Sequence, residues 1–86
     1  MWSSDDMIRE LKNRGKRITK QRKIMIEVIA SRKAGDFKEI YYEISKKDPA
    51  IGQATVYRML LTLEEIGAIQ RVQGYVVNES YEKVAV

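Results

Sequence analysis

Five neighbouring residues in the second half of the chain have side chains suited to the edges of DNA bases. Gln53 can pair with adenine and Arg58 with guanine or a phosphate, while Thr55 can bond either a base or a phosphate. Ala54 and the ring of Tyr57 can lie against the methyl groups of thymine. Because a helix in the major groove usually reads bases with its N-terminal residues, this spacing suits the first turns of a reading helix.

Each of these side chains also has a structural role open to it that needs no ligand. Tyr57 taken alone is more typical of a half-buried packing residue, and Thr55 of a neutral surface position. Arg58 could pair with Glu64 or Glu65, although both lie beyond the i+4 reach of a helical ion pair. These residue types occur together at the start of one helix, between a tight turn and a hairpin. This coincidence favours DNA binding over the separate structural roles.

A run of cations without a counter-charge lies in the first third of the chain. The net charge is +4, but residues 1–33 carry +6 and residues 34–86 carry −2. The positive charges of such a run repel one another, which favours a polyanion as a partner. The alternative is a solvated lysine-rich surface that binds no ligand. The cations of the run are Lys12, Arg14, Lys16, Arg17, Lys20, Arg22 and Lys23.

The composition excludes several classes of function. The 86 residues are 44% hydrophobic, which indicates one small globular domain. The chain has neither cysteine nor histidine, so it has no disulfide, no thiolate or imidazole metal ligand and no serine–histidine triad. No motif pairs a nucleophile with a base, and no apolar run approaches the roughly 18 residues of a membrane span. Since its N-terminus is also unlike a signal peptide, we expect a cytoplasmic protein that is not an enzyme.

These side chains must be positioned by regular elements of the fold. The hydrophobic periodicity predicts that these elements are helices throughout the first two thirds of the chain. The first is expected near residues 5–14, with Ser4 as its N-cap and Gly15 at its end. Thr19 can cap the second, which continues to the break at residues 33–35. The apolar stripes of these helices contain Met7, Ile8 and Leu11, then Ile24, Met25, Ile26, Val28 and Ile29.

Two further helices follow across a short connection. Asp36 can cap the third, with Glu39 in capping-box position, and Pro49 closes it. The fourth extends from Gly52 to Gly67. A tight connection of this kind suits two helices that cross at a large angle. Their expected core residues are Phe37, Ile40, Tyr41 and Ile44, then Val56, Met59, Leu60, Leu63 and Ile66.

The end of the chain favours strands. Residues 69–77 and 81–86 are predicted as the arms of a β-hairpin with a turn at 78–80. We therefore predict a mainly α fold with a small β-hairpin, a winged helix-turn-helix that forms a single domain over residues 1–86. The fourth helix would be the recognition helix and the hairpin the wing, where Arg71 and Lys83 are candidates for contact with a neighbouring phosphate.

The region around the fourth helix resembles the DNA-binding domain of the ferric uptake regulator family. The resemblance is carried by residues 54–58, with residues 49–53 before them and residues 66–69 after them. Upstream, residues 11–15 and 18–22 are similar to the family's entry to its second helix. The similarity covers roughly residues 8–71. The Ala-Thr-Val-Tyr-Arg run is fairly specific for the family, whereas the other pieces alone are weak.

The resemblance implies a winged-helix repressor domain that binds double-stranded, AT-rich operator DNA and regulates metal-uptake or peroxide-stress genes. It also implies that Tyr57 and Arg58 contact the groove, that Thr55 lies at the phosphates or a base edge, and that Thr19 and Arg22 hold the backbone. A cation near the start of the basic run would approach the minor groove. The candidate DNA contacts are Lys12, Arg14, Lys16, Arg17, Thr19, Arg22, Gln53, Ala54, Thr55, Tyr57, Arg58 and Arg71.

The sequence also departs from the family. Lys20 and Gln21 stand where the family often has a proline. Members continue into a dimerisation domain whose metal ligands are largely histidine with aspartate, glutamate and sometimes cysteine. We therefore expect no metal or cofactor in these 86 residues, and Fe, Zn or Mn in the C-terminal domain of a full-length relative. The chain would be the N-terminal part of a regulator or a shortened relative, monomeric and weak on DNA, whereas a full-length relative would be a homodimer.

Two other classes of function remain as alternatives. A winged helix used for protein–protein contact predicts no salt-dependent DNA binding. An enzyme requires a pairing of nucleophile and base that no motif supplies.

Overall fold

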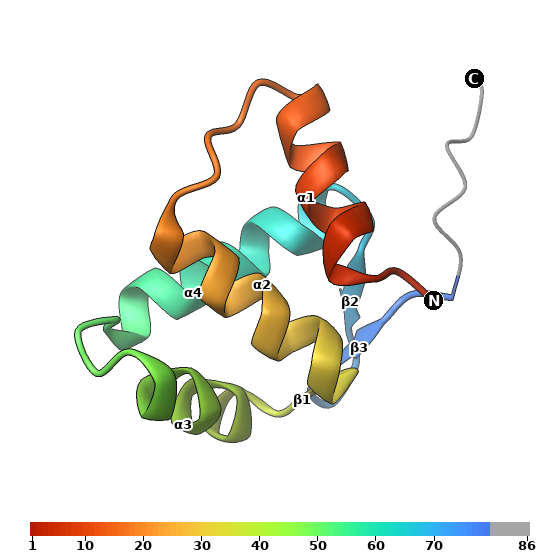
Figure 1. The fold of residues 1–86 in the computed structure, drawn as a ribbon. Helices are drawn as coiled ribbons and strands as arrows, with labels where there is room; N and C mark the ends of the chain where they lie inside the picture. The colour runs from red at the N-terminus through yellow and green to blue at the C-terminus, as the bar shows by residue number, and fades with distance from the viewer. Residues whose placement is uncertain (80–86) are drawn as a thin grey trace.

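The computed structural model describes residues 1–79, in which four helices surround one face of a small antiparallel sheet (Figure 1). The strand order is β1-β3-β2, with Ala34 opposite Val76 and Ile69 opposite Val77. This is the predicted winged helix-turn-helix, although the wing pairs with an additional strand. The elements are α1 (Ser4–Asn13), α2 (Lys20–Arg32), β1 (Ala34–Gly35), α3 (Phe37–Lys47), α4 (Gln53–Glu65), β2 (Ile69–Arg71) and β3 (Tyr75–Val77).

Helix α1 is capped one residue earlier than the sequence predicts. Its N-cap is Ser3, not Ser4, because a capping box needs a carboxylate three residues after the cap. The N–H of Asp6 donates to Ser3 Oγ at 3.1 Å, and the N–H of Ser3 donates to Asp6 Oδ2 at 2.9 Å. With Ser4 as the cap, the third position would be Met7, a buried residue without an acceptor. The predicted end at Gly15 is confirmed by its φ of 77°.

The capping box lowers the pKa of the Asp6 carboxyl below its ordinary value, chiefly because the N–H of Ser3 donates to it. The stability gained in this way is present above the ordinary pKa and is lost as the pH falls through the lowered one. We expect Asp6→Asn to lower the free energy of unfolding by about 0.5–1 kcal/mol at neutral pH. In urea denaturation the difference from wild type should vanish in strong acid, and a difference that persists there would contradict this account.

The N-caps predicted for α2 and α3 are both confirmed. Thr19 Oγ1 accepts from the N–H of Arg22 at 3.2 Å. Asp36 Oδ1 accepts from the N–H of Glu39 at 2.8 Å, and the Glu39 carboxylate accepts from the N–H of Asp36 in return. Between the two helices the chain passes through Lys33, with a φ of 60°, into the strand β1, which the sequence did not predict.

The wing differs from the predicted hairpin. The single arm predicted over residues 69–77 is wrong, because β2 and β3 both lie within it. The turn is at residues 72–74 rather than 78–80: Arg71 faces Tyr75, and the N–H of Val72 donates to the carbonyl of Gly74 at 2.8 Å. The second arm, predicted at residues 81–86 with Lys83, lies outside the described residues.

Two tertiary contacts place the turn there. A Cβ on Gly74 would lie only 3.1 Å from the carbonyl oxygen of Gly35, so glycine permits the close approach of this segment to β1. Asn78, predicted to be in the turn, instead closes the base of the wing. Its N–H donates to the carbonyl of Ala68 at 2.9 Å, and its Nδ2 donates to the carbonyl of Gly67 at 2.7 Å.

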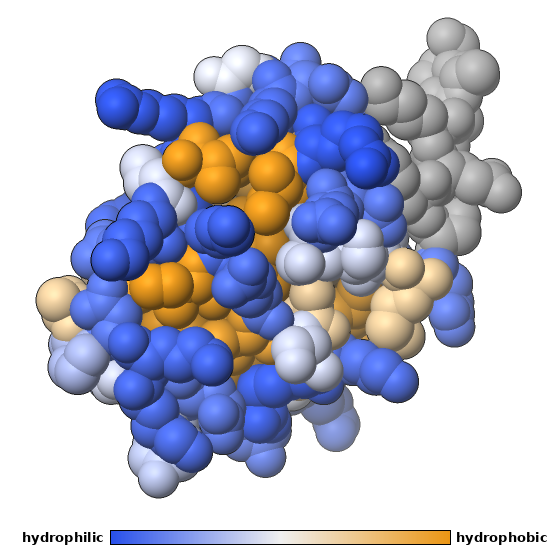
Figure 2. All heavy atoms as spheres, viewed as in Figure 1, coloured by the Kyte–Doolittle hydropathy of each residue, from blue (hydrophilic) through white to orange (hydrophobic). Residues whose placement is uncertain are grey.

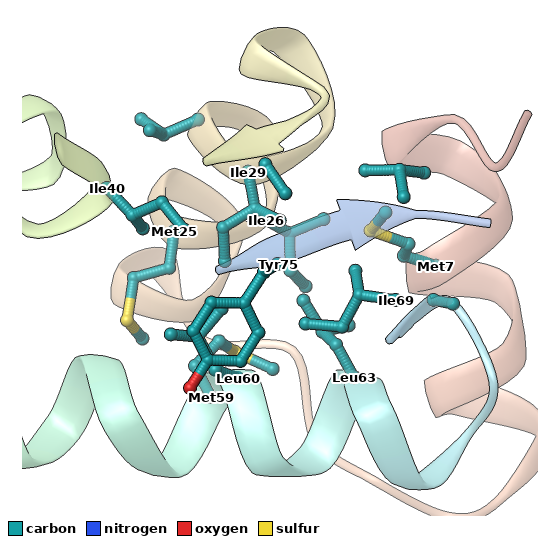
Figure 3. Close-up of a cluster of buried hydrophobic side chains, with 14 of the residues drawn as sticks. Met7, Met25, Ile26, Ile29, Ile40, Met59, Leu60, Leu63, Ile69 and Tyr75 are labelled. Carbon is teal, nitrogen blue, oxygen red and sulfur yellow. The ribbon is translucent and has the colours of Figure 1, made fainter. Parts of the chain in front are cut away.

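The core lies between the helices and the sheet and receives side chains from every helix (Figure 3). Helix α4 supplies Met59, Leu60 and Leu63 toward Ile26 and Ile29 of α2 (Figure 3). The predicted apolar stripes are confirmed, with Ile8, Ile24, Phe37 and Tyr41 at their partly buried margins. Within residues 1–79 no polar or charged residue is buried, so α4 rests on a wholly apolar base.

Trp2 belongs to this core, although the sequence assigned the first residues to a polar terminus. Its exposed fraction is 5%, and its backbone N–H donates to the carbonyl of Asn78 at 3.0 Å. The start of the chain is therefore attached where β3 ends (Figure 1). Among the described residues, no helix is both long and apolar enough to cross a membrane.

Candidate nucleic-acid interface

Helix α4 presents its first turns to solvent. Gln53, Ala54, Tyr57 and Arg58 are exposed, and Thr55 is half-buried at the side of the helix. Their placement follows from the 3.6-residue period, because the positions between them are the buried ones that hold the helix on the core. The structure thus brings the five side chains to the surface that the sequence predicted.

The N-terminus of α4 is accessible to solvent, and the turn before it is fixed by a hydrogen bond and a buried side chain. Its N-cap, Gly52, makes no side-chain cap bond, and nothing lies within 4 Å of the position of a Cβ there. The preceding turn is ordered by Asp48, whose carboxylate accepts from the N–H of Ala50 at 3.0 Å, and by Ile51, which is buried. Unpaired N–H groups at an accessible helix N-terminus favour an anion, so this end of α4 suits a phosphate-bearing ligand.

A hollow of about 260 Å³ joins the start of α2 to the exposed side of α4. Within it, Arg58 Nη2 donates to Thr55 Oγ1 at 3.2 Å, and Arg22 Nη1 donates to the carbonyl of Arg17 at 2.6 Å. Among residues 1–79 no carboxylate lines this hollow, and its charged side chains are Arg22 and Arg58. It is lined by Thr19, Gln21, Arg22, Met25, Thr55, Arg58, Met59 and Thr62.

The hollow brings together two groups of predicted residues that lie far apart in the sequence. Thr19 and Arg22 of the basic run share it with Thr55 and Arg58 of α4. Sequence reasoning missed Gln21 and Thr62. Thr62 Oγ1 donates to the carbonyl of Arg58 at 3.0 Å, a bond from residue i to i−4 that helical spacing could have indicated.

The remaining cations of the predicted site lie around the connection from α1 to α2. Lys12, Lys16 and Arg17 are exposed there. Arg14 differs from them, because its Nε lies 2.9 Å from Glu10 Oε2 and is partly neutralised. The run was defined from Lys12 onward and so did not include Glu10, which lies one helical turn before Arg14.

Arg71 lies on β2 beside α4, where it contacts two tyrosines and one carboxylate. Its guanidinium carbon is 5.9 Å from the ring centre of Tyr57 and 5.5 Å from that of Tyr75. Its Nη2 donates to the Tyr57 hydroxyl at 3.5 Å and lies 3.8 Å from Glu64 Oε1. The bond to Tyr57 and the neighbouring rings and carboxylate raise the pKa of Arg71. Glu64, considered from the sequence as a partner for Arg58, is therefore the partner of Arg71.

Polar side chains cover most of the face seen in Figure 2 and surround a narrower apolar region.

In the part of the chain that the structure describes, no three histidine, cysteine, aspartate or glutamate residues come together in a group that could hold a metal ion.

Comparisons with known proteins place the chain beside metal- and peroxide-responsive regulators. The model of the ferric uptake regulator family matches residues 13–85. A ferric uptake regulation protein of Brucella abortus is 35% identical over 71 residues, which are 81% of this chain and 50% of that protein. The peroxide-responsive repressor PerR of Staphylococcus saprophyticus is 36% identical over 69 residues, 79% of this chain and 47% of that protein.

Solved structures of similar proteins agree with the fold. A zinc-bound manganese uptake regulator superposes with a TM-score of 0.75 at 26% identity, over 88% of this chain and 63% of that one. A further manganese uptake regulator gives a TM-score of 0.70 at 28% identity, over 90% of this chain and 60% of that one. The chain spans about half the length of the curated relatives it matches.

Proposed function

Since the chain belongs to the ferric uptake regulator family, whose members are DNA-binding transcriptional regulators, we propose that residues 1–86 are the operator-reading domain of a repressor. The observation that carries the proposal is the exposed start of α4 beside a cationic hollow shared with α2. The regulated genes would be those of metal uptake or oxidative stress, as the names of the relatives suggest. The chain would act in the cytoplasm as a binding protein rather than an enzyme.

Helix α4 would enter the major groove with its N-terminal turns. Arg58 would bond guanine or a phosphate, and Gln53 would pair with adenine. Ala54 and the ring of Tyr57 would lie against thymine methyl groups, which favours AT-rich sites. Thr55, half-buried beside the hollow, would contact a phosphate or a base edge. The open N-cap at Gly52 permits the close backbone approach that this docking needs.

The cations around α2 would hold the sugar–phosphate backbone. Thr19 and Arg22 face the hollow at the start of α2, where the helix dipole also favours a phosphate. The surface would continue along the end of α1 and the α1–α2 connection, where Lys12, Arg14, Lys16 and Arg17 would follow the backbone toward the minor groove. Arg71 would extend the surface to the wing. Contacts of this kind position a protein on DNA without reading its sequence.

One such domain presents a single reading helix. We propose that this chain is a monomer that binds DNA weakly, and that a full-length relative joins two half-sites as a homodimer. The names of similar proteins mention manganese, zinc and ferric iron. The Fe, Zn or Mn that such a relative senses would accordingly be bound outside these 86 residues.

Enrichment of duplexes from a random-sequence pool by the whole chain tests the proposal. We expect AT-rich sequences to be enriched, and their binding to weaken as salt is added. Absence of both enrichment and salt-dependent binding would contradict the proposal and favour a winged helix used for protein contacts.

Substitutions should separate the residues that read bases from those that hold the backbone. Arg58→Ala and Tyr57→Ala are each expected to cost about 1–3 kcal/mol on the selected duplex and less on a mixed-sequence duplex of equal length. Arg22→Ala should weaken both duplexes about equally, because a phosphate contact is blind to sequence. Fluorescence anisotropy titrations measure both affinities. Equal losses for all three variants on both duplexes would refute the assigned roles.

A further inference from the structure

The contacts of Arg71 with Tyr57, Tyr75 and Glu64 join the wing to α4. The inference drawn from them rests on the proposed role of Tyr57 in reading DNA. We propose that Arg71 is a positioning residue, which holds the Tyr57 side chain in the place from which it reads DNA. The wing would then affect specificity through α4, in addition to any contact of its own with DNA.

The hairpin and the helix place the partners of Arg71 by simple geometry. Tyr75 lies directly opposite Arg71 in the β2–β3 register and is 8% exposed, so it forms a fixed base for the guanidinium. Tyr57 and Glu64 are seven residues apart on α4, which puts them two turns apart on the same face of the helix. The guanidinium thus contacts two elements, with a ring of each within 6 Å.

These contacts restrain a side chain that would otherwise be mobile. Tyr57 is 42% exposed, and within residues 1–79 its hydroxyl accepts a hydrogen bond from Arg71 and from no other side chain. A reading side chain that is already in place avoids the loss of rotamer freedom on binding, which improves discrimination between sequences. Arginine suits this role because its planar guanidinium can stack on a ring and donate to a hydroxyl or a carboxylate together.

A role as a simple phosphate ligand makes a different prediction for the same residue. Arg71 already has Glu64 as a counter-charge at 3.8 Å, so a phosphate would have to displace that carboxylate. Replacement by lysine separates the two roles, because lysine keeps the positive charge but loses the planar group that contacts Tyr57.

Arg71→Lys is therefore compared with the wild-type chain on the selected duplex and on the mixed-sequence duplex. We expect the ratio of the two affinities to fall about two- to fivefold, the size of an exposed cation–π contact. The dependence of binding on salt should keep its slope, since no charge is lost. Gln70→Ala is the matched control, because Gln70 is exposed and adjacent on β2 but points to the other face. It should leave the ratio unchanged.

Two further measurements make the test specific to Tyr57. In a Tyr57→Ala background, Arg71→Lys should have no additional effect on the ratio, because the side chain that it positions is absent. In the free protein, the NMR resonances of the Tyr57 ring should shift in Arg71→Lys and not in Gln70→Ala. An unchanged ratio, an equal effect in both backgrounds, or unshifted Tyr57 resonances would overturn this inference alone. Failure of the wild-type chain to enrich any duplex would overturn the proposed function as well.

Discussion

An increase in salt from about 50 mM to about 200 mM is expected to weaken binding of this chain to duplex DNA by about three orders of magnitude. The reason is the release of counterions from roughly six phosphates, which gives a log–log slope of about −5. The exposed cations around the α1–α2 connection and those of the hollow beside α4 would supply these contacts under the proposed function. Anisotropy titrations of a labelled duplex at several salt concentrations measure the slope directly.

Single substitutions should show which cations contribute. Lys16→Ala and Arg22→Ala are each expected to reduce the slope by about one unit. Arg14→Ala should reduce it less, because Glu10 already neutralises part of its charge. Lys38→Ala is the control, since Lys38 is an exposed cation on α3 outside the proposed surface. A slope near zero for the wild-type chain, or an equal change for Lys38→Ala, would contradict the electrostatic account.

Trp2→Ala is expected to lower the free energy of unfolding by about 3–5 kcal/mol, the usual cost of removing a buried aromatic side chain. Such a loss is a large part of the stability of a small domain. The 5% exposure of Trp2 and its bond to Asn78 carry this expectation. Urea denaturation followed by circular dichroism measures it.

Tyr42→Ala provides the comparison for Trp2→Ala. Tyr42 is also aromatic, but it lies on the outer face of α3 and is 63% exposed. Its replacement should change the free energy of unfolding by no more than about 0.5 kcal/mol. Similar losses for the two variants would show that Trp2 does not belong to the core.

The helices could be predicted because their signals are local. Thr19 and Asp36 are caps whose bonds reach only three residues along the chain, and a glycine with positive φ follows α1. The exposed face of α4 follows equally from its periodicity. The cap of α1 was misplaced by one residue because two serines are adjacent, and only the position of the carboxylate decides between them.

The wing and its contacts could not be predicted from local pattern. Residues 69–77 favour strand except at Gly74, which the sequence indicates only as a possible bulge. The turn there depends on the approach of Gly74 to Gly35, a contact between distant parts of the chain. The cluster of Arg71 with Tyr57 depends in turn on that register, since the two residues are 14 positions apart. Trp2 was missed for a related reason, because its partner Asn78 lies at the opposite end of the described chain.

In mechanical terms, Asn78 is an anchor point with three attachments. Its carbonyl holds the backbone of Trp2, its N–H holds Ala68, and its side chain holds Gly67. A load applied to the chain at this residue would therefore reach the segment before α1 and the turn after α4 together, and not the wing alone.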